Sequence, residues 1–279
     1  MFWFARVGST SLIAAAVLAG TILHSTPRQP VMSAETRLSS AGMSLAWSDE
    51  FNGSAGSEVN RTFWGYDHGP GGWGNNELQT YTMNRENSRL DGAGNLQIRA
   101  IKDGDSYTSA RLVTRNRVEF QSGLLEVRAK LPEGQGIWPA IWLLGANVAE
   151  VGYPASGEID VMELVNTGTM IHNAIHGPKT GAPDQKWKLS FDFWAGRNLS
   201  DDYHVYQVYR SPGVIVIGID GIPVGVYSRY ATPPGSDWVF DAPMYLILNV
   251  AVGGDWPGNP NASTAFPATM LVDYVRHWQ

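Results

Sequence analysis

The stretch Met244-Tyr-Leu-Ile-Leu-Asn-Val-Ala-Val-Gly-Gly254 decides the fold class, because its side chains alternate with a period of two. Every even-numbered residue from Met244 to Val252 is apolar, and the odd-numbered set includes Tyr245 and Asn249. Successive side chains of a strand point to opposite faces, whereas a helix would repeat its apolar residues about every 3.6 positions. The stretch is therefore predicted to be a β-strand with one wholly apolar face.

Four further stretches alternate in the same way, so strands are predicted along most of the chain. They are NLQIRAIK at 95–102, LLEVRAKL at 124–131, VIVIGIDG at 214–221 and MLVDYVRHW at 270–278. The third ends in Asp220-Gly221, a pair typical of a tight hairpin turn, and in the fourth we expect Val272 and Tyr274 to share a face. Many short strands without an internal repeat or a second linker predict one all-β domain, a sandwich or barrel.

The composition supports a β-protein and excludes several kinds of site. The 279 residues include 31 Gly, 16 Pro and 11 Trp but no Cys, which rules out disulfides, thiolate metal sites and cysteine nucleophiles. Lys and Arg number 20 against 26 Asp and Glu, which gives a net charge of -6. Such an acidic chain argues against a nucleic-acid partner, which would need a basic face.

The first 24 residues differ from the rest of the chain and are predicted to be a signal peptide. Arg6 precedes an apolar run from Leu12 to Leu23, and this run is shorter than the roughly 20 residues that a membrane-spanning helix needs. A short membrane anchor is the alternative, but no stable membrane association is expected. Residues 25–43, rich in Ser, Pro and Thr, are predicted to be a propeptide or flexible linker before the domain at 44–279. The protein is therefore expected to be secreted.

Three carboxylates are concentrated in Gly157-Glu-Ile-Asp-Val-Met-Glu-Leu164. On a regular strand Glu158 and Asp160 share a face, whereas Glu163, at an odd offset, points to the other. A β-bulge near Met162 would return Glu163 to the carboxylate face, and bulges are common beside active sites. Paired carboxylates can hydrolyse glycosidic bonds, and the spacing chooses neither the retaining nor the inverting outcome. The alternative is a solvated strand face, although three like charges without an interleaved cation cost stability.

Four more segments accompany this strand, and together they make the chain resemble glycoside hydrolase family 16 in its laminarinase-like branch. They are WGNNELQTY at 73–81, GQGIWPAIWLL at 134–144, GGDWPG at 253–258 and DYVR at 273–276, in the order of the family. The resemblance extends from Leu45 to the last residue. It implies a β-jelly-roll sandwich of two curved antiparallel sheets, with a substrate cleft on the concave face.

The same resemblance implies a role for each carboxylate. Glu158 would be the nucleophile, Glu163 the general acid/base, and Asp160 a hydrogen-bond partner of the nucleophile. Flat aromatic faces and indole N–H groups suit sugar rings, and the residues expected to bind substrate are Asn76, Glu77, Trp138, Trp142, His176 and Trp256. One departure is Tyr153, in Tyr-Pro-Ala-Ser, where the family usually has Trp, and this change alters the rim of a donor-side subsite.

No cofactor is expected for catalysis, but the sequence leaves open whether the protein binds a structural metal ion. His172 and His176 have the spacing of two ligands on one strand face, yet no third zinc ligand is evident. The family resemblance points instead to calcium on the convex face, held by Glu50, Asp273 and a backbone carbonyl near Gly94. These would supply only part of the six to eight oxygen ligands that calcium takes, and the other alternative is that both acids are plain surface residues.

Together these features predict a secreted, retaining endo-β-1,3-glucanase that cleaves laminarin-type polysaccharides by double displacement and is a monomer. One alternative is a family member that acts on another polysaccharide, such as mixed-linkage β-glucan, agarose or xyloglucan. A sulfated substrate would call for a basic cleft, which an acidic chain disfavours. The alternative from another class is a non-catalytic β-glucan-binding protein, in which the carboxylates are expected to be replaced, whereas all three are present.

Overall fold

The computed structural model describes residues 37–279. The predicted signal peptide at 1–24 and residues 25–36 of the predicted linker lie outside the described residues. Inside them almost all regular structure is β-strand, with short helical turns at η1 (Gly72–Gly74), α1 (Val148–Val151) and η2 (Arg229–Ala231). In this part of the chain, no helix is long and apolar enough to cross a membrane.

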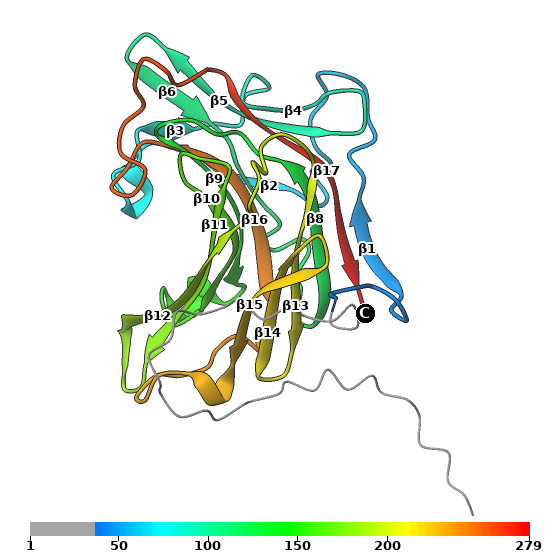
Figure 1. Ribbon diagram of the computed structural model, residues 1–279, viewed down its shortest axis with the longest axis vertical. Helices are drawn as coiled ribbons and strands as arrows, with labels where there is room; N and C mark the ends of the chain where they lie inside the picture. The colour runs from blue at the N-terminus through cyan, green and yellow to red at the C-terminus, as the bar shows by residue number, and fades with distance from the viewer. Residues whose placement is uncertain (1–36) are drawn as a thin grey trace, which may run out of the picture. The chain divides into compact units, whose positions relative to one another are not determined.

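The strands form two sheets that lie face to face (Figure 1). The seven-stranded sheet has the order β12 (Ala182–Trp194), β11 (Met170–Lys179), β10 (Glu158–Leu164), β9 (Ile137–Gly145), β16 (Met244–Val252), β7 (Arg111–Val113) and β2 (Gly65–Asp67). The ten-stranded sheet has the order β15 (Ile222–Ser228), β14 (Val214–Ile219), β13 (His204–Ser211), β8 (Gly123–Lys130), β17 (Ala268–Trp278), β5 (Leu96–Asp103), β6 (Ser106–Ser109) and β3 (Gln79–Tyr81), with β1 (Leu45–Asp49) beside β17 and β4 (Ser88–Leu90) beside β5. Neighbouring strands are antiparallel except β3 and β6. The predicted jelly-roll sandwich is confirmed.

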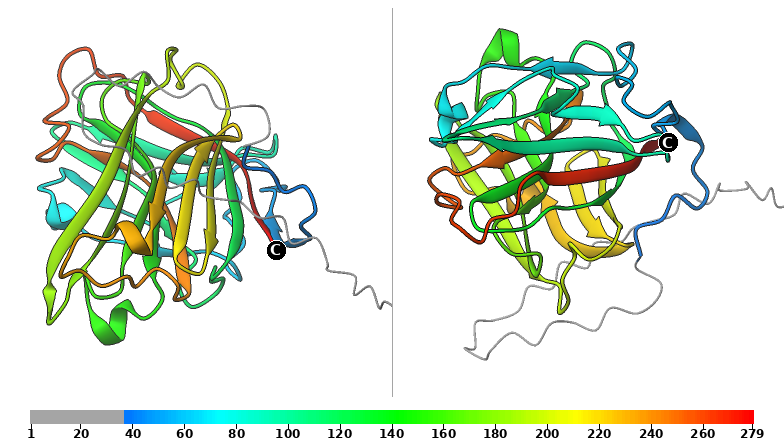
Figure 2. Two further views of the ribbon diagram at one scale, coloured as in Figure 1. Left: turned by 60° about the horizontal axis from the view of Figure 1, so that its bottom comes forward. Right: turned by 90° about the horizontal axis from the view of Figure 1, so that it is seen from above.

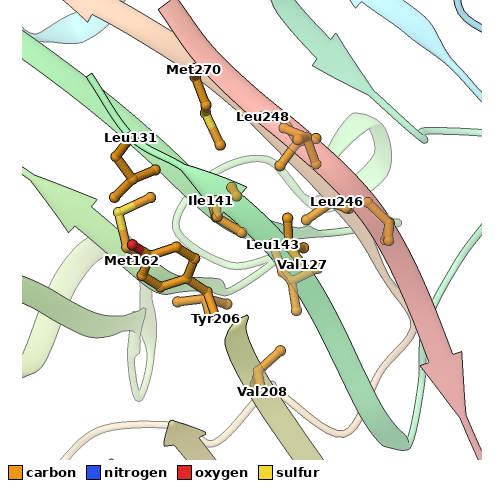
Figure 3. Packing of buried hydrophobic residues seen from close by; sticks show 14 of the residues in the cluster. Val127, Leu131, Ile141, Leu143, Met162, Tyr206, Val208, Leu246, Leu248 and Met270 are labelled. Atoms are coloured by element: carbon orange, nitrogen blue, oxygen red, sulfur yellow. The ribbon is translucent and has the colours of Figure 1, made fainter. Parts of the chain in front are cut away.

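The core lies between the sheets and is built from the inward faces of the predicted strands. Leu246 and Leu248 of β16 are fully buried, as the alternation in this stretch predicts. Figure 3 shows Leu246 near Val127 of β8, and Met162 of β10 near Tyr206 of β13, so that side chains of both sheets meet in the core. Because the inward faces close this core, the outward face of the seven-stranded sheet can carry polar and aromatic groups.

The hairpin turn between β14 and β15 shows how local sequence fixes an edge of the domain. Asp220 and Gly221 join β14 to β15 with positive φ values of 52° and 82°, which is the conformation that the predicted two-residue hairpin requires. Leu38 is buried against this hairpin, and its N–H donates to the carbonyl of Gly221 at 2.8 Å. Leu38, near the end of the linker predicted at 25–43, therefore packs against the domain that is predicted to begin at residue 44.

The predicted face of Tyr274 is wrong. In β17 the pairing register with β8 shifts between Val272 and Tyr274, which is the mark of a β-bulge. After this shift Val275, not Tyr274, continues the buried face of Val272. Tyr274 lies half-buried with the guanidinium of Arg276 3.8 Å from the centre of its ring.

Candidate active site

The three carboxylates of β10 reach one face because this strand bulges where the sequence predicts. Glu158 pairs with His176 of β11 and Glu163 with His172, and the register shifts between Asp160 and Glu163. The pairing of β10 with β9 shifts at the same place. The extra residue lets Val161 and Met162 both enter the core, so that the parity of the strand changes before Glu163.

This face of β10 forms the floor of a cleft of about 560 Å³ on the outward side of the seven-stranded sheet. Strands β9, β11, β12 and β16 flank it, together with β7 and the loops around Gly74 and Trp256. Figure 2 shows the curvature of this sheet from two further sides. The sequence-predicted residues that line the cleft are Glu77, Trp138, Trp142, Glu158, Asp160, Glu163, His176 and Trp256.

His176 joins two of the carboxylates. Its Nε2 lies 2.9 Å from Oδ2 of Asp160 and 3.6 Å from Oε1 of Glu158, and both His176 and Asp160 are buried. The histidine therefore orients the carboxylates, in addition to lining the cleft. One ligand-type atom from each of these three residues lies within 4.8 Å of the others. The group could hold a metal ion, but hydrolysis by a carboxylate pair does not need one.

Glu163 lies among aromatic side chains. Trp138 of β9 donates its indole N–H to Oε1 of Glu163 at 3.1 Å. The ring of Trp256 meets that of Trp138 edge-on, with 5.3 Å between their centres. One indole ring thus contacts this carboxyl group and a second packs against the first. Both rings line the cleft, where they can contact the apolar face of a sugar.

Burial and mutual repulsion shift the proton affinity of both glutamates. Burial first, and then the charge of Asp160, raise the pKa of Glu158 from 4.5 to about 8. Burial and the charges of Asp160 and Glu158 raise the pKa of Glu163 well above its ordinary value. Lys186, Arg111 and the hydroxyl of Tyr153 oppose the rise at Glu158, whereas Lys188 and the Trp138 N–H oppose it at Glu163. Two cations and a hydroxyl thus favour the ionised form of Glu158, and one cation and an indole N–H favour that of Glu163.

A chain of hydrogen bonds supports the far wall of the cleft. Trp142 donates its indole N–H to Oδ1 of Asn249 at 2.8 Å, and the amide of Asn249 donates to the hydroxyl of Tyr81 at 3.0 Å. Tyr81 in turn donates to Glu77, which also accepts from Asn75 at 3.1 Å. Burial raises the pKa of Glu77. The network holds Trp142 and Glu77 in place before any ligand binds.

Asn76 is the one predicted substrate-binding residue that does not line the cleft. Its backbone has a positive φ of 55°, and its exposed side chain donates to both oxygens of Asp255 at 3.0 and 3.1 Å. It therefore ties its own loop to the loop of Trp256. Asn75, its neighbour, lines the cleft instead.

Sequence reasoning missed the cations of the cleft. Arg111 of β7 places its guanidinium 4.6 Å from the centre of the Trp142 ring. Lys186 and Lys188 of β12 also line the cleft, and their ammonium groups lie over Tyr153 and Trp256 at 5.7 and 5.9 Å from the ring centres. The alternation in KWKL shows that the two lysines share a face, but not which face that is.

The residues predicted to hold calcium have other partners. Arg276 donates two hydrogen bonds of 2.9 Å to the carboxylate of Glu50, and Arg128 donates to Asp273 at 2.6 Å. Gly94 lies near the side chain of Asn52. Because a guanidinium already neutralises each carboxylate, the residues do not fit a calcium shell built from these two acids.

Comparison with known proteins agrees with this site. A sequence model of glycosyl hydrolases family 16 matches residues 75–276. The β-glucanase of Rhodothermus marinus is 40% identical in an alignment of 252 residues that covers 83% of this chain and 84% of that protein. The glucan endo-1,3-beta-glucosidase A1 of Niallia circulans is 36% identical in an alignment of 264 residues that covers 85% of this chain but 38% of that protein.

Solved structures agree as well. The endo-beta-1,3-glucanase of Pyrococcus furiosus is 41% identical and superimposes with a TM-score of 0.75, over 85% of this chain and 94% of that structure. The family match covers most of the chain, and it includes the strand that carries all three carboxylates. The chain is therefore a glycoside hydrolase and belongs to family 16 of the glycosyl hydrolases.

Proposed function

We propose that the protein is a retaining endo-β-1,3-glucanase that hydrolyses laminarin-type glucans. The observation that carries this proposal is the bulge of β10, which brings Glu158, Asp160 and Glu163 onto one face at the floor of a cleft. The similarity to the glucan endo-1,3-beta-glucosidase A1 of Niallia circulans and to the endo-beta-1,3-glucanase of Pyrococcus furiosus supports the substrate class.

In the proposed first step Glu163 protonates the oxygen of the scissile bond while Glu158 attacks the anomeric carbon. The raised pKa of Glu163 keeps its proton available for the leaving oxygen. Glu158 attacks in its ionised form, which Lys186, Arg111 and Tyr153 stabilise. The product is a covalent glycosyl-enzyme and a shortened glucan with a new hydroxyl group.

In the second step Glu163, now ionised, takes a proton from water, and the water attacks the anomeric carbon. The bond to Glu158 breaks, and the configuration of the sugar is retained after two inversions. Asp160 and His176 hold Glu158 in place through both steps, because Nε2 of His176 contacts the two carboxylates. Trp138 remains hydrogen-bonded to Glu163 and fixes its direction.

The lining of the cleft suits a neutral sugar chain. Trp138, Trp142 and Trp256 offer aromatic faces, and Asn75 and Glu77 offer polar groups. The lining reaches from Arg111 on β7 to Lys186 on β12, so a glucan can cross the strands of the sheet and be cut within its length.

Sizing of products tests this function against its alternatives. Mature protein would be incubated with laminarin, curdlan, mixed-linkage glucan, xyloglucan and agarose, with Glu163→Gln as the inactive control. We expect a mixture of β-1,3-linked oligosaccharides from laminarin, a viscosity that falls before much reducing sugar appears, and a first-formed β-anomer by NMR. Glucose released from one chain end would contradict endo action, and binding without products would favour a glucan-binding protein.

We propose further that the protein is secreted as a monomer. The charged and then apolar pattern of Arg6 and Leu12–Leu23 supports export. N-terminal sequencing of protein collected from the medium, followed by light scattering, tests both statements. Retention of an uncleaved N-terminus on membranes, or a mass twice that of the chain, would contradict them.

A further inference from the structure

Trp194 is the last residue of β12, and it is 65% exposed. Strand β12 is an edge strand of the seven-stranded sheet, and its pairing with β11 is regular from Lys188, opposite His176, to Trp194, opposite Met170. Alternate side chains of a regular strand share a face. Trp194 therefore stands on the face of Lys188, which lines the cleft.

A row of contacting side chains runs from Glu163 toward this tryptophan. Trp138 donates to Glu163 and contacts Trp256. The ring of Trp256 meets that of His172 edge-on at 4.7 Å between centres. His172 Nδ1 lies 2.8 Å from Oδ1 of Asp192 on β12. Asp192 is two residues before Trp194 on the same face, so the row is continuous with the cleft.

The row lies on the leaving-group side of the site. It begins at the group that gives its proton to the leaving oxygen, and His172 pairs with Glu163 across the strands. From Glu163 to Trp194 the path crosses two strand spacings and advances two residues, a separation of roughly 12 Å between Cα atoms. That is longer than one sugar ring, so Trp194 lies beyond the first leaving-group subsite.

We infer that Trp194 is the aromatic platform of a distal subsite, which binds the reducing-end part of the glucan two or more sugars past the scissile bond. The inference rests on the proposed function, because it takes Glu163 as the acid. Gly196 lies under the edge of the indole, with Cζ3 3.9 Å from the position that a Cβ would take. The other surface of the ring is left to solvent and to a sugar.

Bond-cleavage frequencies with reducing-end-labelled laminari-oligosaccharides test the inference. Wild type would be compared with Trp194→Ala, with the conservative Trp194→Phe, and with Tyr230→Ala as a control that removes an aromatic side chain that is 98% exposed on η2. In Trp194→Ala we expect cleavage of the hexaose to shift toward shorter labelled fragments and its kcat/KM to fall about two- to tenfold, by analogy with the stacking of an aromatic pair. An activated aryl β-glycoside, whose leaving group fills at most the first leaving-group subsite, should react as in wild type.

The outcomes separate this inference from the function on which it rests. Trp194→Phe and Tyr230→Ala should both give the wild-type cleavage pattern. Equal melting temperatures of the variants show that the fold is intact. An unchanged cleavage pattern in Trp194→Ala, with active wild type, overturns the subsite alone. A wild-type protein that cleaves none of the β-glucans overturns the proposed function, and the subsite with it.

Discussion

Replacement of Glu158 by Gln should abolish hydrolysis and at the same time make the protein more stable near neutral pH. Burial and the charge of Asp160 raise the pKa of Glu158 from 4.5 to about 8 in the folded protein. At pH 7 the unfolded chain has therefore lost this proton, while the folded chain still binds it. A carboxyl group whose pKa is raised by folding destabilises the folded state most above its folded pKa, because there the folded state must hold a buried charge.

The size of the effect follows from the same pKa. Between pH 4.5 and pH 7 the free energy of unfolding falls by about 1.4 kcal/mol per pH unit, because the folded state must keep a proton that the unfolded state has lost. The loss amounts to about 3 kcal/mol at pH 7. Glu158→Gln keeps the neutral shape of the side chain and removes this pH dependence. For a domain of this size 1 kcal/mol corresponds to about 2–4 °C, so we expect a melting temperature about 6–12 °C above wild type at pH 7.

Melting curves of the two proteins at several pH values measure this difference directly. The gain should be small at pH 4.5, where wild-type Glu158 is protonated in the folded state and half protonated in the unfolded state, and should be largest above pH 8. The control is Glu119→Gln, which changes an exposed glutamate of the same length and should melt like wild type throughout. A Glu158→Gln variant that is no more stable at pH 7, or equally more stable at pH 4.5, would refute the view that Glu158 is held in a site that penalises its charge.

Three further predictions follow from the site. With azide and an activated aryl β-glycoside, Glu158→Ala should give an inverted glycosyl azide and Glu163→Ala a retained one, because only Glu163→Ala can form the covalent intermediate. If NMR showed the same anomer from both variants, the assignment of roles would be wrong. Lys186→Met should move the acidic limb of kcat/KM to higher pH, because Lys186 lowers the pKa of Glu158; a pH profile like that of the control Lys102→Met would speak against it. A calcium chelator should leave the melting temperature unchanged, because Arg276 and Arg128 already pair with Glu50 and Asp273, and a fall on chelation, restored by added calcium, would show a site that these pairs do not exclude.

The two bulges show which part of the fold the sequence could predict. The bulge of β10 was predictable because a regular strand would bury Glu163 in the core, a cost that only an extra residue removes. In β17 a regular strand would likewise turn Arg276 into the core and leave Val275 outside, whereas the bulge buries Val275 and keeps Arg276 outside the core. The prediction for Tyr274 followed the alternation only up to that residue. A bulge is therefore predictable from the sequence only when the pattern is followed on both sides of the extra residue.

The cations of the cleft could not be predicted for a different reason. Arg111 enters the site because β7 pairs with β16, where Arg111 stands opposite Asn249, and such a pairing of distant segments leaves no local pattern. Lys186 and Lys188 alternate with buried Trp187, but alternation identifies a shared face without placing it in the molecule. These positions follow from the topology of the sheet.

The three cations of the cleft also bear on the charge of the substrate, because the charge of the cleft differs from that of the whole chain. The net charge of -6 belongs to the whole chain. Charges more than about 8–10 Å away are screened in salt, so a polymer in the cleft responds mainly to the charges of the lining. In that lining Arg111, Lys186 and Lys188 lie beside Glu158, Asp160, Glu163 and Glu77. An anionic polymer would meet carboxylates at the place where the bond is cut, and the cations there are already engaged in stabilising Glu158 and Glu163. The local balance therefore favours a neutral glucan, and it does so for a reason that the composition of the whole chain did not contain.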